Sequence, residues 1–253
     1  MINELKVKTK RENYEIPCIA NFPEGMKKVI IAIHGFGSTK RSETIISLIR
    51  LLDEHNIGVI SLDLPAHGDS EETGEYLTLN NCIDDIETVE EFLKSKFNEI
   101  NIGFFASSFG AYLTLLKINK SRNKYGSVVL RCPAINMAKI LEESLKIENT
   151  TLEEFRNKGY VTEGFARRFD VTYEMYKELL NNDVLKNYNS NNKILIIHGT
   201  EDTTAPISDS IKLKDKFSNY INIVKIEGAN HRFQKTSQIE KVLDIATEYI
   251  VNS

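Results

Sequence analysis

Short, continuous runs of apolar residues recur along the chain, and many of their members are β-branched. The clearest run covers residues 29–33 and reads Val-Ile-Ile-Ala-Ile before it ends at His34 and Gly35. Such a run is typical of a strand that is buried on both faces of a parallel sheet. We expect strands at residues 5–9, 16–22, 29–33, 58–64, 100–105, 127–130, 193–198 and 221–226, with a polar turn at 11–13.

Between most of these runs lie longer segments whose apolar residues recur at helical spacing. They predict helices at residues 43–54, 79–97, 109–118, 208–217 and 236–251. Strands that alternate with helices in this way form βαβ units, in which the sheet is mainly parallel and helices cover both of its faces. The sequence therefore predicts an α/β fold.

The alternation stops between residues 136 and 188. This segment is charged and helix-prone and lacks a buried-strand run. We expect a helical insertion that lies over the edge of the sheet, with the Asn-rich stretch 187–192 leading back from it. Its apolar residues are scattered and include Leu141, Leu145, Phe155, Phe165, Tyr173, Tyr176 and Leu179.

The size and composition are those of one globular domain. A chain of 253 residues is long enough to bury most of its apolar surface in one core. Hydrophobic residues make up 41% and charged residues 27%, which argues against a disordered or fibrous chain. The net charge of -4 and the pI of about 5.8 give no attraction to nucleic acid or anionic membranes. We expect a single domain over residues 1–253 without a nucleic-acid partner, and a homodimer stays open.

The N-terminus and the cysteines indicate the compartment. The first residues lack the apolar core of a signal peptide, and no stretch approaches the ~18 apolar residues needed to span a bilayer. Cys18, Cys82 and Cys132 are widely separated and form no CxxC pair, so they signal neither a disulfide framework nor a zinc site. We expect a cytoplasmic protein with no membrane span, in which the cysteines are small buried side chains.

The strongest chemical signal is the segment 103–111, which lies between an expected strand and an expected helix. Ser108 has the small residues Ala106 and Gly110 two positions before and after it. Small residues at these positions allow the strained turn known as a nucleophile elbow. Ser107 would have phenylalanine at both positions, which is too bulky for the turn. The segment predicts Ser108 as a catalytic nucleophile, and the alternative is an ordinary turn rich in small residues.

A serine nucleophile needs a base and a carboxylate that orients the base. Asp202 follows the expected strand at 193–198, and His231 follows the last expected strand in a loop that begins with Gly228. Taken alone, Asp202 could be a turn residue and His231 a solvated loop residue, and Glu201 competes for the carboxylate role. The order Ser, Asp, His matches the order found with this elbow. We therefore predict a Ser108–His231–Asp202 triad.

The segment His34-Gly35-Phe36-Gly37 follows the first buried strand. At this place, enzymes with a nucleophile elbow supply one backbone N–H to the tetrahedral oxyanion. We assign this donor to Phe36 and its partner to Phe109, directly after the nucleophile. His34 is expected to support the loop and not to transfer protons.

Two alternative sites are disfavoured. Residues 35–40 contain glycine, lysine and hydroxyl residues, but their order fits neither a Walker loop nor a dinucleotide fingerprint. His67 and Asp69 could be imagined as metal ligands, but no HExxH motif or third ligand accompanies them. We expect no cofactor and no metal.

Five motifs together resemble the α/β-hydrolase superfamily, and within it small bacterial esterases related to cinnamoyl and feruloyl esterases and to monoglyceride lipases. The motifs are HGFG (34–37), DLPAHGDS (63–70), ASSFGA (106–111), HGTEDTTAP (198–206) and GANHRF (228–233). The resemblance implies an eight-stranded, mostly parallel sheet and an insertion at 136–188 that caps the acyl pocket. Ala106 stands where glycine is usual, and Ser107 where many relatives carry histidine.

The triad and the resemblance predict a serine hydrolase that cleaves small to medium, moderately apolar or aromatic carboxylic esters through an acyl-enzyme. A peptidase, a thioesterase or an acyltransferase would use the same triad. A hydrolase fold that binds a ligand without catalysis is the alternative from another class. The expected partner is a small-molecule ester.

Overall fold

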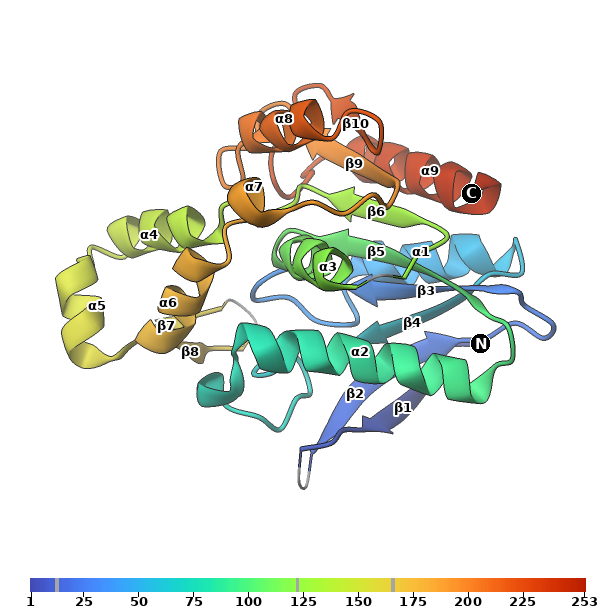
Figure 1. Cartoon of the computed structure of the whole chain (residues 1–253), viewed down its shortest axis with the longest axis horizontal. Coiled ribbons are helices and arrows are strands. Elements are labelled where there is room, and N and C mark those ends of the chain that lie inside the picture. Colours follow the sequence, from blue (N-terminus) through green and yellow to red (C-terminus); the bar gives the residue numbers. More distant parts are fainter. Residues whose placement is uncertain (12–13, 122, 165–166) are drawn as a thin grey trace.

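An eight-stranded sheet forms the centre of the computed structural model, which describes residues 1–11, 14–121, 123–164 and 167–253 (Figure 1). Its strand order is β1-β2-β4-β3-β5-β6-β9-β10. The strands are β1 (Asn3–Lys8), β2 (Glu15–Asn21), β3 (Lys28–Ile33), β4 (Gly58–Leu62), β5 (Asn101–Ser107), β6 (Val128–Arg131), β9 (Ile194–Gly199) and β10 (Ile221–Ile226).

The sheet is parallel from β4 to β10, and β2 pairs antiparallel with both β1 and β4. The predicted α/β fold with a mainly parallel sheet is confirmed. Residues Val29–Ile33 of β3 are fully buried, as expected for a central strand with helices on both faces.

In the described part of the chain, five helices outside the insertion cover the sheet, each within a few residues of its predicted range. They are α1 (Glu43–Asp53), α2 (Leu79–Lys96), α3 (Phe109–Lys120), α8 (Ile207–Lys216) and α9 (Thr236–Asn252), and a short 3₁₀ helix (Gly74–Tyr76) precedes α2. The buried side chains of α1 and α9 share one apolar core, and those of α2 and α3 lie in the core on the opposite face. Among the described helices, none is long and apolar enough to cross a membrane.

The insertion, residues 136–188, lies to the left of the sheet in Figure 1. We expected only helices here, but the segment also holds a two-stranded antiparallel ribbon. Each ribbon strand has four residues and buries only one or two apolar side chains, which is too short for a recognisable sequence pattern. The elements are α4 (Met137–Ile147), α5 (Leu152–Lys158), β7 (Tyr160–Glu163), β8 (Phe169–Thr172), α6 (Tyr173–Asn181) and α7 (Val184–Asn187).

The ribbon brings the insertion onto the loop that follows β3. The ring of Phe169 lies 5.2 Å from the ring of Phe36 and 4.4 Å from that of His67, measured between centroids. The insertion is thus packed against the segment that we expected to hold an oxyanion. Phe165 and part of the turn expected at 11–13 fall outside the described residues.

Candidate active site

Ser108 occupies a strained turn between β5 and α3. Its φ of 51° and ψ of -112° lie in a region that residues other than glycine rarely adopt, at a cost of about 1–3 kcal/mol. Three backbone hydrogen bonds hold the turn: the Ser108 N–H donates to the Arg131 carbonyl at 2.9 Å, and the Ser108 carbonyl accepts from Tyr112 and Ala134 at 3.0 and 3.1 Å. The surrounding structure therefore determines where the hydroxyl points.

The three residues of the expected triad, which are far apart in the sequence, lie in hydrogen-bond contact. Nε2 of His231 is 2.9 Å from Oγ of Ser108, and Nδ1 of His231 is 2.7 Å from Oδ2 of Asp202. These side chains follow the carboxyl ends of β5, β9 and β10, which share one edge of the sheet because the strands are parallel. With Nδ1–H donating to Asp202, Nε2 of the neutral imidazole is free to accept the serine proton.

The carboxylate of Asp202 is fully buried and is surrounded by donors. Its Oδ1 accepts hydrogen bonds from the backbone N–H groups of Thr204 at 3.0 Å and Ala205 at 2.8 Å. Burial by itself raises the pKa of Asp202, but the hydrogen bonds from His198 and His231 outweigh it and hold the pKa well below its usual range. Asp202 is therefore an anion near neutral pH.

His198 supports this carboxylate, a role that the sequence did not reveal. Its Nε2 lies 3.2 Å from Oδ2 of Asp202 and 2.8 Å from the Ala205 carbonyl, and its Nδ1 lies 2.9 Å from Oγ of Ser210. The side chain is completely buried. The only signal in the sequence is a histidine at the end of a buried strand, four residues before the aspartate. The competing Glu201 is exposed.

The loop after β3 approaches Ser108 closely enough to favour glycine at position 35. A Cβ on Gly35 would lie 3.2 Å from Cβ of Ser108. Within the described residues, the backbone N–H groups of Phe36 and Phe109 donate to no protein acceptor. The two phenylalanine rings meet edge to face with centroids 5.4 Å apart. Both donors are thus available beside the hydroxyl.

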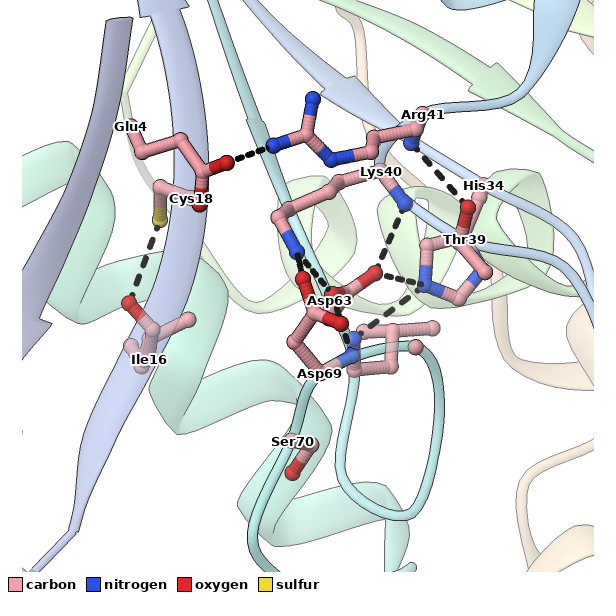
Figure 2. A network of polar contacts seen from close by, with 12 residues as sticks. Glu4, Ile16, Cys18, His34, Thr39, Lys40, Arg41, Asp63, Asp69 and Ser70 are labelled. Atoms are coloured by element: carbon pink, nitrogen blue, oxygen red, sulfur yellow. Dashed lines mark hydrogen bonds and ion pairs between the residues drawn. The ribbon is translucent and has the colours of Figure 1, made fainter. Parts of the chain in front are cut away.

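An ion cluster around the buried pair of Lys40 and Asp63 anchors this loop to the turn after β4, as Figure 2 shows. Lys40 is only 1% exposed, and its Nζ contacts Oδ2 of Asp63 at 2.5 Å and the carboxylate of Asp69. The backbone N–H of Lys40 donates to Oδ1 of Asp63 at 2.7 Å, and that of Asp69 donates to Oδ2 at 2.8 Å. The sequence showed Lys40 only as part of a phosphate-loop pattern and Asp69 only as a disfavoured metal ligand.

His34 and His67 lie beneath the loop as neutral side chains. Burial lowers the pKa of His34 to about 4 and that of His67 to about 3. The Nε2 atom of His34 accepts a hydrogen bond from the Leu64 N–H at 3.2 Å, and Nδ1 of His67 contacts the Pro65 carbonyl at 2.8 Å. His34 therefore braces the loop, and neither histidine reaches the triad by a hydrogen bond in the described part of the chain.

One group of buried side chains has donor atoms close enough together to suggest a metal site. One ligand atom each from Cys132, His198 and Asp202 lies within 4.8 Å of the others. Burial raises the pKa of Cys132 far above its ordinary value, so its sulfur is a protonated thiol and a poor ligand. Both imidazole nitrogens of His198 and both carboxylate oxygens of Asp202 already have protein partners. The donor set therefore does not favour a metal.

A cavity of about 690 Å³ opens onto Ser108 and His231. Its wall comes from the loop after β3, the start of α1, Ser107, Arg131, and the loop between β10 and α9. Within the described residues, the insertion contributes nothing to this wall.

Comparison with known proteins identifies a family and several close folds. Residues 24–193 match the family Hydrolase_4, described as serine aminopeptidase S33. No curated protein is significantly similar to the sequence.

Solved structures of similar fold cover almost the whole chain. Est1E from Butyrivibrio proteoclasticus, with ferulic acid bound, superposes with a TM-score of 0.83 at 18% identity, covering 98% of each chain. Alpha/beta hydrolase domain-containing protein 10 from mouse has a TM-score of 0.78 at 17% identity over 100% of this chain and 99% of that chain. The Pyrococcus furiosus esterase PF2001 has a TM-score of 0.75 at 18% identity over 100% and 91% of the two chains.

Proposed function

The chain belongs to the Hydrolase_4 family, and from this premise we propose that it cleaves carboxylic esters with Ser108 as the nucleophile. It has the α/β-hydrolase fold and is a serine hydrolase. One observation carries the proposal: the hydroxyl of Ser108 is 2.9 Å from the imidazole of His231, which is 2.7 Å from the carboxylate of Asp202. A serine hydroxyl is a weak nucleophile near neutral pH, and this arrangement supplies the base that it needs.

The reaction begins when Oγ of Ser108 attacks the ester carbonyl and His231 takes the hydroxyl proton. Asp202 stabilises the imidazolium that forms. The N–H groups of Phe36 and Phe109 bind the developing oxyanion, and the loss of one such donor typically costs about 3 kcal/mol of transition-state stabilisation. His231 then protonates the leaving alcohol. In the second half-reaction, His231 activates water, which releases the acid from the serine.

Aromatic side chains beside the nucleophile support a substrate with an apolar or aromatic acyl group. Phe36 and Phe233 line the cavity that contains Ser108, and Phe109 packs on Phe36. A neighbour of the same fold carries ferulic acid, an aromatic acid. We propose small to medium esters as substrates. We also propose that the insertion acts as a cap. The contact of Phe169, in the insertion, with Phe36 supports this proposal.

The family description keeps an aminopeptidase as the second candidate. A free amino terminus is a cation, and enzymes that select it present carboxylates to it. The cavity wall instead carries the arginines Arg131 and Arg232, and Glu43 is its one carboxylate among the described residues. This charge pattern argues against selection of a free amino terminus.

Short p-nitrophenyl esters and a fluorophosphonate probe test the proposal. We expect the protein to hydrolyse the esters and to be labelled, and Ser108→Ala to lose both activities. Ser107→Ala is the matched control and should keep the labelling. Labelling that persists in Ser108→Ala would show that another residue is the nucleophile.

A parallel panel of amino-acid amides, thioesters and alternative acyl acceptors separates the ester reaction from its relatives. A large preference for one of these would replace the esterase assignment by a peptidase, thioesterase or acyltransferase. An intact protein that neither turns over any ester nor reacts with the probe would instead be a ligand-binding hydrolase fold.

A further inference from the structure

Arg131 presents its guanidinium to the cavity that holds the nucleophile. It is the last residue of β6 and is in register with Ser107 on the neighbouring β5. Its Nε donates to Oγ of Ser107 at 3.2 Å, and its guanidinium carbon lies 5.3 Å from the ring centroid of Phe233. These two contacts fix the side chain, which is half-buried and forms part of the wall beside Ser108.

The guanidinium of Arg131 has no carboxylate partner among the described residues, and its terminal amino groups donate to no protein acceptor there. Burial lowers the pKa of Arg131, and the negative charge of Asp202 opposes this effect without a direct contact. A desolvated cation without an anion is costly, so proteins normally pair it. The structure leaves this one available to a ligand.

Other sheltered cations in the described chain contact protein oxygens with their terminal nitrogens, either carboxylates or, for Lys28 and Arg167, backbone carbonyls. Arg11 contacts Glu72 at 2.9 Å, Lys40 contacts Asp63 at 2.5 Å, and Lys117 contacts Glu90 at 2.7 Å. Arg131 departs from this pattern at the place where substrate would bind. A polar group that is unpaired inside a cleft is a candidate for ligand recognition.

Two helix N-termini lie at the wall of the same cavity. Ser42, Glu43 and Thr44 at the start of α1 and Thr236 at the start of α9 line the wall. Neither helix has a side-chain cap on its first N–H groups. The N-terminal end of a helix favours an anion, so α9 acts in the same direction as Arg131, whereas the carboxylate of Glu43 opposes the terminus of α1.

We propose that the substrate carries a carboxylate or a similar oxyanion in addition to the scissile ester, and that Arg131 binds this group. The inference rests on the proposed ester hydrolysis at Ser108 and specifies its substrate class. A planar guanidinium whose terminal amino groups are free binds a carboxylate through two parallel hydrogen bonds. Ser107 and Phe233 position Arg131 for this contact, so that one end of the ester is held while Ser108 attacks the carbonyl.

Matched ester pairs that differ only in charge test the proposal. The first pair is 4-acetoxybenzoate and its methyl ester, and the second is p-nitrophenyl hydrogen glutarate and p-nitrophenyl methyl glutarate. We expect a higher kcat/KM for the anion in at least one pair, and the pair concerned shows which side of the ester is anionic. In Arg131→Gln the ratio of anionic to neutral kcat/KM should fall on the order of tenfold or more, as for the loss of a charged hydrogen bond.

The ratio distinguishes recognition from a purely structural role, because damage to the turn lowers both members of a pair equally. Ser107→Ala is the control, since it removes the contact to Nε but keeps the guanidinium, and Arg131→Lys keeps the charge. Both should retain a higher ratio than Arg131→Gln. Ratios that are the same in the wild type and Arg131→Gln for both pairs would overturn the proposal, while hydrolysis of the neutral esters would leave the proposed function standing.

Binding to an inactive protein keeps the two proposals separate. Calorimetry with Ser108→Ala should show tighter binding of 4-acetoxybenzoate than of its methyl ester, and Ser108→Ala/Arg131→Gln should lose that difference. Competition by benzoate and by phenyl phosphate then shows whether a carboxylate or a phosphate is preferred. Equal affinity for 4-acetoxybenzoate in both variants would refute the anion site even if no ester is ever turned over.

Discussion

His198 and His231 contact the same oxygen of Asp202. Nδ1 of His231 lies 2.7 Å from Oδ2, and Nε2 of the buried His198 lies 3.2 Å from it. The orientation of the carboxylate, and through it that of His231, is therefore determined by a second imidazole that is itself held by Ser210 and the Ala205 carbonyl.

Asp202→Asn should lower kcat by roughly 10⁴-fold, because the neutral amide neither selects the Nδ1–H tautomer of His231 nor stabilises the imidazolium. Steady-state kinetics with a p-nitrophenyl ester measure the effect. The exposed neighbour Glu201 provides the control, and Glu201→Gln should retain nearly full activity. A comparable loss of activity in both variants would show that Asp202 is not the carboxylate that orients His231.

His198→Phe should lower kcat by about 10- to 100-fold with little change in KM, since Asp202 loses a donor to its charged group. Ser210→Ala keeps this donor and removes only the partner of Nδ1, so it should retain most of the activity. Circular dichroism establishes that both variants are folded. If both variants lose the same activity, the contact with Asp202 does not explain the role of His198.

Lys40→Met should reduce the free energy of unfolding by about 3–5 kcal/mol, because it leaves the carboxylate of Asp63 buried without its cation. Urea denaturation measures the change, and Lys27→Met, at an exposed lysine, should have almost no effect. The double variant Lys40→Met/Asp63→Asn should recover part of the loss. Equal stability of Lys40→Met and the wild type would show that the cluster does not anchor the loop.

The free energy of unfolding should fall as the pH decreases from about 6.5 toward 4. The pKa of His34 is lowered to about 4 and that of His67 to about 3 from an ordinary value of 6.5, so the unfolded chain binds protons in this range that the folded protein does not. The contribution of the two neutral histidines to the free energy of unfolding is complete above pH 6.5 and is lost as the pH falls. His67→Phe should make the decline shallower, as followed by thermal unfolding across this range. Parallel curves for the two proteins would contradict the assignment.

The runs of apolar residues were sufficient to predict most of the fold. A strand such as β3 is buried on both faces, so its whole sequence is apolar and the pattern is visible without knowledge of its neighbours. The ribbon of β7 and β8 was missed because each of its strands is short and depends on the other for pairing. The local pattern carries no information about such a partner.

The candidate site divides in the same way. The sequence alone reveals the small residues around Ser108 and the order in which Asp202 and His231 follow it. It does so because a strained turn and the loops after parallel strands have local requirements. The contact of His198 with Asp202, and the absence of a carboxylate beside Arg131 among the described residues, were decided by the tertiary structure. Both depend on which strands lie side by side, and the burial that gives them their chemical importance arises only when distant segments pack together.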